Sequence, residues 1–399
     1  MWPSNYLVKI IGWLLIIYGC AGGQSHGYTN SFVESKLLVI VLMVKNEASV
    51  IRQTLQPFVD AGIDAFFIFD TGSTDDTVAI TKKFFDAHNI PAMIQQEPFI
   101  DFSTSRNRAL QLAQEAFPHA CFMLMLDAEW YMHNVKALIE FCNAHTTDSQ
   151  ASYLVRIMND QIDFYTPRLI RCRTNTYFVG AVHEVLSTVS TEKVPPNCFF
   201  EWRPSPPGQE KSRCRWNRDA QLLLKDYQLN PDNPRTVFYL AQTYACLQDW
   251  ENARTWYEKR ITMPGWDEEN FIAHYRLAQV YEHFKDADRA ITMYSKAFEL
   301  RPHRAEPLLR LAQHYWNVDN KALCFLLAKY AVDLPYPDSD VLFIEKELYD
   351  YTRYDLLGMS AWYVNQFAVG KAALLKALKT HPNDMHLYKN LYFYLEDNV

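Results

Sequence analysis

Acidic residues follow two apolar runs of the sequence, at the points where those runs end. The run at residues 66–69 ends in Asp70, and the run at residues 121–126 ends in Asp127 and Glu129. Runs that are apolar on both faces predict buried strands of a parallel sheet, and open sheets bind ligands at the carboxyl ends of their strands. Two carboxylates one residue apart can share Mn2+ or Mg2+ and leave positions open for phosphate oxygens. A solvated acidic loop is the alternative.

Two later groups of residues could complete such a site. A neutral imidazole suits Mn2+ and a carboxylate can take a proton from a hydroxyl, so His183 and Glu184 are a candidate metal ligand and base. Arg106 and Arg108 fall in the first turn of an expected helix, whose amides and dipole favour an anion such as a diphosphate. A structural core histidine and a solvated basic face are the alternatives.

The elements that position these residues alternate between strand and helix from residue 36 to about residue 201. This order predicts a Rossmann-like α/β domain with a mostly parallel sheet at residues 36–208, ended by a Pro-rich linker at 203–208. Residues 163–189 are expected to complete the sheet. The expected strands lie at 36–44, 66–70, 90–95, 121–126 and 151–158, and the expected helices at 48–61, 77–85, 135–143 and from 101 onward.

Beyond the linker, small and aromatic residues recur at near-equal offsets. Leu-Ala-x-x-Tyr begins at residues 240, 277 and 311, within units that start near residues 234, 271, 305 and 351. The spacing resembles the tetratricopeptide repeat, in which pairs of antiparallel helices stack through small residues. We therefore expect an all-α solenoid at residues 211–399, with capping helices at 213–228 and 384–396.

These repeats should dock on the α/β domain, and their first helices should offer a concave surface to an acceptor or a protein partner. The residues expected on that surface are Tyr239, Gln242, Tyr275, Gln279, Arg310 and Gln313. A structural or solvated position is the alternative for each of them. If the surface selects the acceptor, a chain truncated after about Gly208 should still hydrolyse a donor slowly but lose transfer to the natural acceptor.

Composition limits the remaining possibilities. A net charge of -7 without a long basic run argues against nucleic acid as a partner. The eight cysteines include no CxxC pair, so neither a zinc ribbon nor a disulfide framework is indicated. Residues 1–24 hold a short apolar stretch that predicts a signal peptide or a short membrane anchor. It indicates export or membrane association without excluding the cytoplasmic face, and a buried first helix or strand is the alternative.

Together the motifs resemble those of the GT-A, family-2-like nucleotide-sugar glycosyltransferases. Residues 44–47, 69–77, 105–107 and 126–129 come in that family's order and spacing. Residues 168–171 and 180–184 resemble the subgroup with tetratricopeptide repeats behind the catalytic domain. The resemblance implies an inverting hexosyl- or N-acetylhexosaminyl-transferase that uses a nucleoside diphosphate sugar, usually of UDP, and a glycan, lipid or protein acceptor.

The resemblance also implies a role for each matching residue. Lys45, Asn46 and Glu47 match the first nucleotide loop, Asp70 the residue that reads the base, and Arg106 with Asn107 the motif that holds the nucleotide. Asp127, Glu129 and His183 would hold Mn2+ or Mg2+, and Glu184 would be the base.

This sequence departs from the family pattern in two places. The acidic motif reads Asp-Ala-Glu followed by Trp130, which places a bulky ring at the donor pocket, and the common downstream Glu-Asp base motif is missing. Asp160 and Asp163 are therefore alternatives to Glu184 as the base. A non-catalytic interaction protein that keeps a nucleotide-sugar-binding domain is the main rival function.

An aspartic protease is a weaker rival, suggested by Asp-Thr-Gly-Ser at residues 70–73. Those enzymes need two such loops, and this chain has one.

Overall fold

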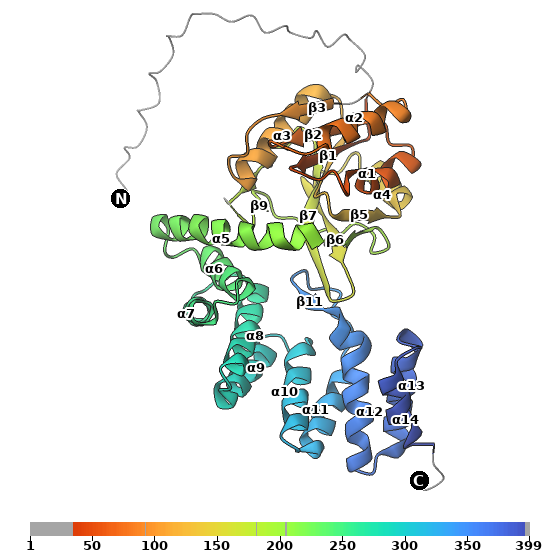
Figure 1. Cartoon of the computed structure of the whole chain (residues 1–399), viewed down its shortest axis with the longest axis vertical. Helices are drawn as coiled ribbons and strands as arrows, with labels where there is room; N and C mark the ends of the chain where they lie inside the picture. Colours follow the sequence, from red (N-terminus) through yellow and green to blue (C-terminus); the bar gives the residue numbers. More distant parts are fainter. Residues whose placement is uncertain (1–34, 92, 181, 204–205, 396–399) are drawn as a thin grey trace, which may run out of the picture. The chain divides into compact units, whose positions relative to one another are not determined.

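The computed structural model describes residues 35–91, 93–180, 182–203 and 206–395, and Ser35–Val399 form one compact unit (Figure 1). The expected signal or anchor segment at residues 1–24 lies outside the described residues. None of the described helices combines the length and the apolarity that a membrane span needs.

A nine-stranded sheet forms the centre of the α/β region, in the order β3-β2-β1-β4-β7-β6-β10-β5, with β11 paired to β7. Strands β3, β2, β1 and β4 are parallel, whereas β7 runs antiparallel to β4 and β6. A separate hairpin joins β8 and β9. The strands are β1 Leu38–Val44, β2 Phe66–Asp70, β3 Met93–Gln96, β4 Phe122–Leu126, β5 Trp130–His133, β6 Ser152–Met158, β7 Ile162–Arg171, β8 Phe178–Val179, β9 Val185–Leu186, β10 Phe199–Trp202 and β11 Ile344–Glu345.

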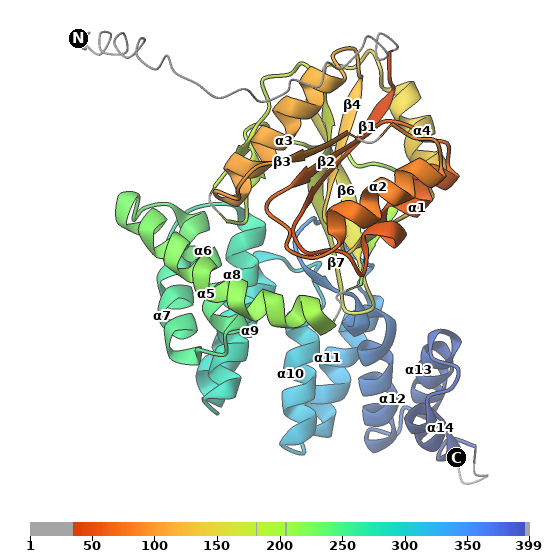
Figure 2. The ribbon, with the colours of Figure 1, turned by 45° about the horizontal axis from the view of Figure 1, so that its top comes forward.

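Helices cover both faces of the parallel strands (Figure 2). Alternate residues of β1, such as Ile40 and Leu42, join one core with apolar residues of α1, α2 and α4. Helix α3 packs against β1 and β2. Burial on both faces explains why these strands read as continuous apolar runs. The helices are α1 Ile51–Asp60, α2 Thr77–Ala87, α3 Phe102–Ala116 and α4 Val135–Ala144.

The second half of the described chain is a series of antiparallel helix pairs, α6 with α7, α8 with α9, α10 with α11, and α12 with α13. Fully buried alanines such as Ala241, Ala278 and Ala312 allow the close approach of neighbouring helices. The helices are α5 Pro206–Leu229, α6 Pro234–Cys246, α7 Trp250–Arg260, α8 Asp267–His283, α9 Ala287–Leu300, α10 Glu306–Asn317, α11 Lys321–Asp333, α12 Arg353–Tyr363, α13 Phe367–Thr380 and α14 Met385–Tyr392, with a π-helical turn at Leu348–Thr352.

The predicted Rossmann-like α/β domain followed by an all-α repeat region is confirmed. Helix α5 begins at Pro206, inside the stretch at residues 203–208 that was expected to be a linker. The division at 1–24, 36–208 and 211–399 stays a prediction. The longer spacing before the last repeat is also explained, because the chain between α11 and α12 forms β11, which pairs with β7.

The segment between α11 and α12 is called the insertion below. It docks the repeats on the α/β region, and docking of the repeats was expected. Ile344 pairs with Asp163 in register, the Tyr336 hydroxyl donates to the Asp163 carboxylate at 2.5 Å, and Lys193 donates to the Asp338 carbonyl. A backbone ladder, a buried carboxylate and a lysine therefore hold the two regions together.

The insertion also corrects the expectation of an open concave surface. The hydroxyl of Tyr275 donates to Glu345 at 3.0 Å, and Arg310 donates to both the Tyr275 hydroxyl and Glu345. These two side chains of the repeats are occupied by the chain's own insertion, so they are not offered to a partner.

Candidate functional site

A cavity of about 710 Å³ lies at the carboxyl ends of β1 and β4. Because these strands are neighbours, the loops that follow them meet at one edge of the sheet. The lining includes most of the predicted site residues, namely Lys45, Asn46, Glu47, Arg106, Asp127, Glu129 and His183. Asp70, Asn107 and Glu184 are not among the lining residues.

Asp70 organises the loop beside the cavity. Its side chain is fully buried and accepts hydrogen bonds from the Ser73 amide, the Ser73 hydroxyl and, at 2.8 Å, the Gln96 amide group. The Asn46 side chain in turn accepts from the Thr74 amide at 2.7 Å. These bonds join the loops after β1 and β2 into one wall, so Asp70 shapes the cavity from behind.

Asn46 has φ 58°, a left-handed conformation that asparagine adopts more readily than most residues. Its amide donates to the Ser73 hydroxyl at 2.9 Å, and the next amide, that of Glu47, donates to Thr77 at 2.7 Å. The first nucleotide loop is thereby held in one conformation by the loop that follows β2.

Arg106 joins two of the predicted acidic residues. Its Nε donates to Glu184 Oε1 at 2.6 Å and its Nη2 to Asp127 Oδ1 at 2.7 Å, while the side chain is only 3% exposed. Burial alone would lower the pKa of Arg106, but the charges of Asp127 and Glu184 raise it above its usual value. Its third nitrogen, Nη1, is buried without a hydrogen-bond partner.

Asp127 lies at the floor of the cavity and is the more accessible of the two carboxylates, with 36% of its side chain exposed against 6% for Glu184. Burial tends to raise the pKa of Asp127, but Arg106 and Arg168 hold it below its usual value. The carboxylate is therefore charged at neutral pH and can attract a cation.

Arg168 forms the back of this cluster. It lies 3.6 Å from Glu184 Oε1 and its guanidinium stacks over the rings of Trp130 and Phe178, at 5.0 and 5.7 Å from their centroids. Burial and the neighbouring charge of Arg106 lower the pKa of Arg168 to about 10. Trp130, which departs from the family motif, therefore supports a buried arginine while it also lines the cavity.

Asn107 holds the hairpin behind the cavity. Its side chain donates to the Phe178 carbonyl at 2.9 Å and accepts from the Phe178 amide at 2.7 Å. This pairing fixes β8 beside α3, and with it the chain that leads to His183.

His183 also lines the cavity, and its backbone has a left-handed conformation with φ 52°. Its ring stacks on Tyr239 at a centroid distance of 3.9 Å and an interplanar angle of 11°. Enclosure by the protein lowers its pKa to about 4, although the residue as a whole is exposed. The imidazole is therefore neutral at pH 7, the form that binds a metal.

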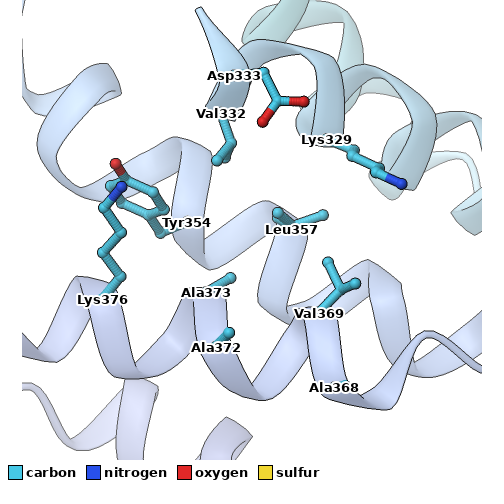
Figure 3. Close-up of a pocket in the computed structure, with 10 residues that line it drawn as sticks. All are labelled: Lys329, Val332, Asp333, Tyr354, Leu357, Ala368, Val369, Ala372, Ala373 and Lys376. Atoms are coloured by element: carbon cyan, nitrogen blue, oxygen red, sulfur yellow. The ribbon is translucent and has the colours of Figure 1, made fainter. Parts of the chain in front are cut away.

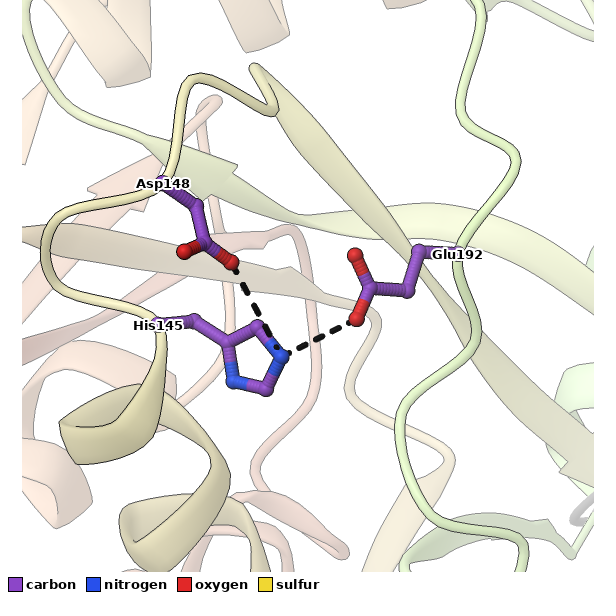
Figure 4. A group of neighbouring side chains, drawn as sticks. All are labelled: His145, Asp148 and Glu192. Atoms are coloured by element: carbon purple, nitrogen blue, oxygen red, sulfur yellow. Dashed lines mark hydrogen bonds and ion pairs between the residues drawn. The ribbon is translucent and has the colours of Figure 1, made fainter.

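Asp127, Glu129 and His183 share the cavity but do not converge closely. Within the described ranges, the one group of three histidine, cysteine or acidic side chains whose ligand atoms lie within 4.8 Å of one another is elsewhere, at His145, Asp148 and Glu192 (Figure 4). There His145 Nε2 lies 2.9 Å from Glu192 and 3.8 Å from Asp148. Its Nδ1 donates to the Phe141 carbonyl at 2.7 Å, so Nε2 is the ring nitrogen that faces the two carboxylates.

The comparisons agree with this geometry. Residues 39–192 match the family model described as Glycosyl transferase family 2, and residues 272–304 match the tetratricopeptide repeat. Residues 39–192 form a family 2 glycosyltransferase domain. The recognition of this domain, with tetratricopeptide repeats behind it, is confirmed. The search of curated proteins gave no match.

Three solved structures are among those similar to part of this chain. The crystal structure of MamA is 14% identical, covers 45% of this chain and 95% of its own, and has a TM-score of 0.35. YrrB, a repeat protein with an unusual peptide-binding site, is 14% identical over 45% of this chain and 84% of its own, with a TM-score of 0.35. The amino-terminal domain of stress-induced protein-1 from C. elegans is 19% identical over 33% and 98%, with a TM-score of 0.28. Scores this low say nothing about function.

The cavity of the glycosyltransferase domain also contains residues that the sequence did not single out. Helix α5 contributes Arg215 and Arg218, and the segment before α3 contributes Phe99. Arg218 stacks over Phe99 at 4.9 Å, and Arg215 Nε lies 3.8 Å from Asp219. The sequence signal for these two arginines is weak. They lie near the start of a helix that was expected only to cap the repeats, and that role gives no reason to place them at the cavity.

A second cavity, of about 420 Å³, lies within the repeats between α11, α12 and α13 (Figure 3). Alanine, valine and leucine side chains line most of it, with Lys376 stacked over Tyr354 at 4.8 Å. It lacks the converging charged groups that distinguish the cavity of the glycosyltransferase domain.

Proposed function

We propose that the chain is a metal-dependent glycosyltransferase that moves a sugar, with inversion, from a nucleoside diphosphate, in particular UDP, to an acceptor. The observation that carries the proposal is the position of Asp127 and Glu129 in one cavity with the loop at residues 45–47 and with Arg106. Loops of this domain family at the strand ends hold the nucleotide, and acidic residues beside them suit a cation on its diphosphate.

The types of residue present suit a divalent cation, and their ligand atoms would have to come closer together to hold one. Two carboxylates and a neutral imidazole are suitable ligands for Mn2+ and, through the carboxylates, for Mg2+. When bound, the cation would stabilise the negative charge that develops on the leaving diphosphate. Asp127, Glu129 and His183 would hold it, and each lines the cavity.

Arg106 would assist by contacting the donor's phosphate oxygens. Its buried Nη1 has no partner within the described protein, whereas Nε and Nη2 are held by carboxylates. A buried N–H group without a hydrogen-bond partner is costly. A phosphate oxygen of the nucleotide sugar would accept a hydrogen bond from it. The guanidinium is fixed in advance, so little freedom is lost when the donor binds.

Glu184 remains the proposed base, and the contacts of its carboxylate differ from those of the two alternatives, Asp163 and Asp160. Its Oε1 accepts from Arg106 and lies 3.6 Å from Arg168, so one of its two oxygens is engaged. Asp163 is a weaker candidate because Arg156 and Tyr336 already bind its carboxylate. Asp160 is exposed in the turn between β6 and β7.

A non-catalytic interaction protein that binds a nucleotide sugar is the second candidate. The ion pair between Arg106 and Asp127 favours it, because one oxygen of a proposed metal ligand is already engaged. We also propose that the acceptor is a glycan, a lipid or a protein. Residues 1–24 are proposed to direct export or membrane association.

Thermal unfolding tests nucleotide and metal binding together. UDP with Mn2+ at 100 times the dissociation constant should add about 2.7 kcal/mol to the free energy of unfolding. UDP with a chelator should add much less. Equal stabilisation with and without the metal would contradict metal dependence, and no stabilisation by any nucleoside diphosphate would contradict the whole proposal.

A further inference from the structure

The first repeat helix reaches the candidate metal ligand of the glycosyltransferase domain. The Tyr239 ring of α6 is stacked nearly parallel on the His183 ring, at 3.9 Å between centroids. Arg235, one turn earlier on the same helix, donates from Nη2 to the His183 carbonyl at 3.2 Å. One residue of the loop is therefore held at both its ring and its backbone by the repeats.

The two α6 side chains are themselves fixed. Tyr239 is 6% exposed, and the Arg235 guanidinium lies over its ring at 4.8 Å. Arg235 Nη1 donates to Glu269 of α8 at 2.6 Å. The start of α6 is capped by Asn233, whose side chain accepts from the Arg235 amide at 3.1 Å. The contact to His183 is thus supported by two consecutive repeats.

His183 needs such support because its backbone is in the left-handed region. Residues other than glycine occupy that region at a cost, and they stay there when surrounding contacts determine the conformation. Neighbouring Glu184 is anchored separately by Arg106. Removing the α6 contacts would therefore free the His183 ring while leaving the next residue in place.

We infer that Tyr239 and Arg235 of the first repeat are positioning residues for His183, so that the repeats complete the metal-binding side of the transferase site. This inference rests on the proposed function. A purely structural role for the same contacts would hold the two regions together without affecting metal affinity, and the experiment separates these two roles.

The experiment is a calorimetric titration with Mn2+ in the presence of UDP, carried out on the purified full chain. It compares the wild type with Tyr239→Ala, Tyr239→Phe and Tyr244→Ala. Tyr244 is the matched control, since it is on the same helix but packs within the repeats. Loss of a group that orients a metal ligand typically weakens metal affinity by about 10- to 100-fold. We expect that loss for Tyr239→Ala only, with Tyr239→Phe restoring most of the affinity because it keeps the stacked ring.

Binding of UDP in the presence of a chelator should be equal in all four proteins, because the wall formed by residues 45–47 and 71–77 is untouched. An unchanged Mn2+ affinity in Tyr239→Ala, or an equal loss in Tyr244→Ala, would overturn the inference. If Tyr239→Ala does not fold, Arg235→Gln removes the bond to the His183 carbonyl, and an unchanged Mn2+ affinity there would overturn it equally. Failure of the wild type to couple Mn2+ with UDP would instead show that the proposed function is wrong.

Discussion

At the scale of residues, the site is a balance of buried charges around Arg106. Two carboxylates share one guanidinium, and a second arginine, Arg168, lies behind Glu184. A buried ion pair is stable only while its partners are present, since an uncompensated charge is costly. Asp127 can exchange part of this pairing for a cation because it is the exposed member, whereas Glu184 is enclosed.

Replacement of Glu184 by Gln tests its role as the base. Gln retains an oxygen that accepts from Arg106 but cannot take a proton, so we expect donor transfer to fall by about 10²- to 10⁴-fold with nearly unchanged UDP affinity. Turnover and calorimetric UDP binding measured on one preparation check this. If affinity and turnover fall equally, Glu184 positions Arg106 instead of acting as the base.

The sequence predicted the cavity's acidic residues, and the physical reason is local. Asp127 and Glu129 follow a buried strand directly, so their position at the sheet edge follows from the strand alone. The partner of Glu184 could not be predicted in this way. Arg106 and Glu184 are 78 residues apart, and only the folded chain shows that they form an ion pair. Asp70 was expected to face a base, but the structure places it behind the loop wall.

At the scale of elements, α5 has a second role beside the one expected. Its residues 213–228 were predicted to cap the repeats, and the helix does pack against α6. Its arginines also line the cavity of the glycosyltransferase domain. Apolar periodicity predicts a helix and the face that it buries. It does not predict what the polar face of the helix contacts in the folded chain.

Removal of the two α5 arginines should weaken binding of the diphosphate. Arg215 and Arg218 bring positive charge to the cavity, so we expect Arg215→Ala combined with Arg218→Ala to raise the dissociation constant of UDP by about tenfold, a loss of about 1.4 kcal/mol. Binding of uridine should not change, because it has no phosphate. The exposed Arg213 on the same helix provides the control, Arg213→Ala. An equal loss for uridine would show that the arginines do not act on the diphosphate.

Asp219 of α5 gives a prediction for stability against pH. The side chain is 5% exposed and its Oδ1 has no hydrogen-bond partner in the described structure. Burial raises its pKa from 3.8 to about 6. A folded-state pKa above the unfolded value means that ionisation destabilises the fold. This penalty is fully present above about pH 6 and disappears as the pH falls below about 4.

Asp219→Asn should therefore raise the free energy of unfolding at pH 8, by about 1 to 2 kcal/mol once the nearby Arg215 is allowed for. At pH 4 the variant and the wild type should be nearly equal. Urea unfolding at the two pH values measures both differences. A gain of the same size at pH 4 would show that the ionisation of Asp219 is not the cause.

At the scale of the whole molecule, the repeats and the glycosyltransferase domain depend on each other. Strand β11 extends the sheet, α5 forms part of the cavity wall and α6 contacts His183. The repeat pattern could be predicted because small residues recur along the sequence. The pairing of β11 with β7 could not, since a two-residue strand leaves no periodicity and its partner lies far away in the sequence.

This dependence changes the expected result of truncation. The sequence alone suggested that a chain ending at Gly208 would still hydrolyse donor. The structure instead predicts that this truncation loses the Arg215 and Arg218 wall and exposes the β7 edge, so it should aggregate or bind UDP at least tenfold more weakly. Size-exclusion chromatography and UDP calorimetry check both results. A monomeric truncation with full UDP affinity would contradict the dependence.

Hydrolysis of labelled nucleotide sugars by the purified chain tests the central claim most directly, because it needs no knowledge of the acceptor. We predict that at least one UDP-sugar is cleaved with Mn2+ or Mg2+, that a chelator abolishes the reaction, and that Asp127→Asn lowers its rate by at least about 10³-fold while the variant remains folded. Cleavage at the wild-type rate by Asp127→Asn, or with the chelator present, would contradict the metal-dependent mechanism. Binding of UDP-sugars without cleavage of any of them would favour the non-catalytic interaction protein.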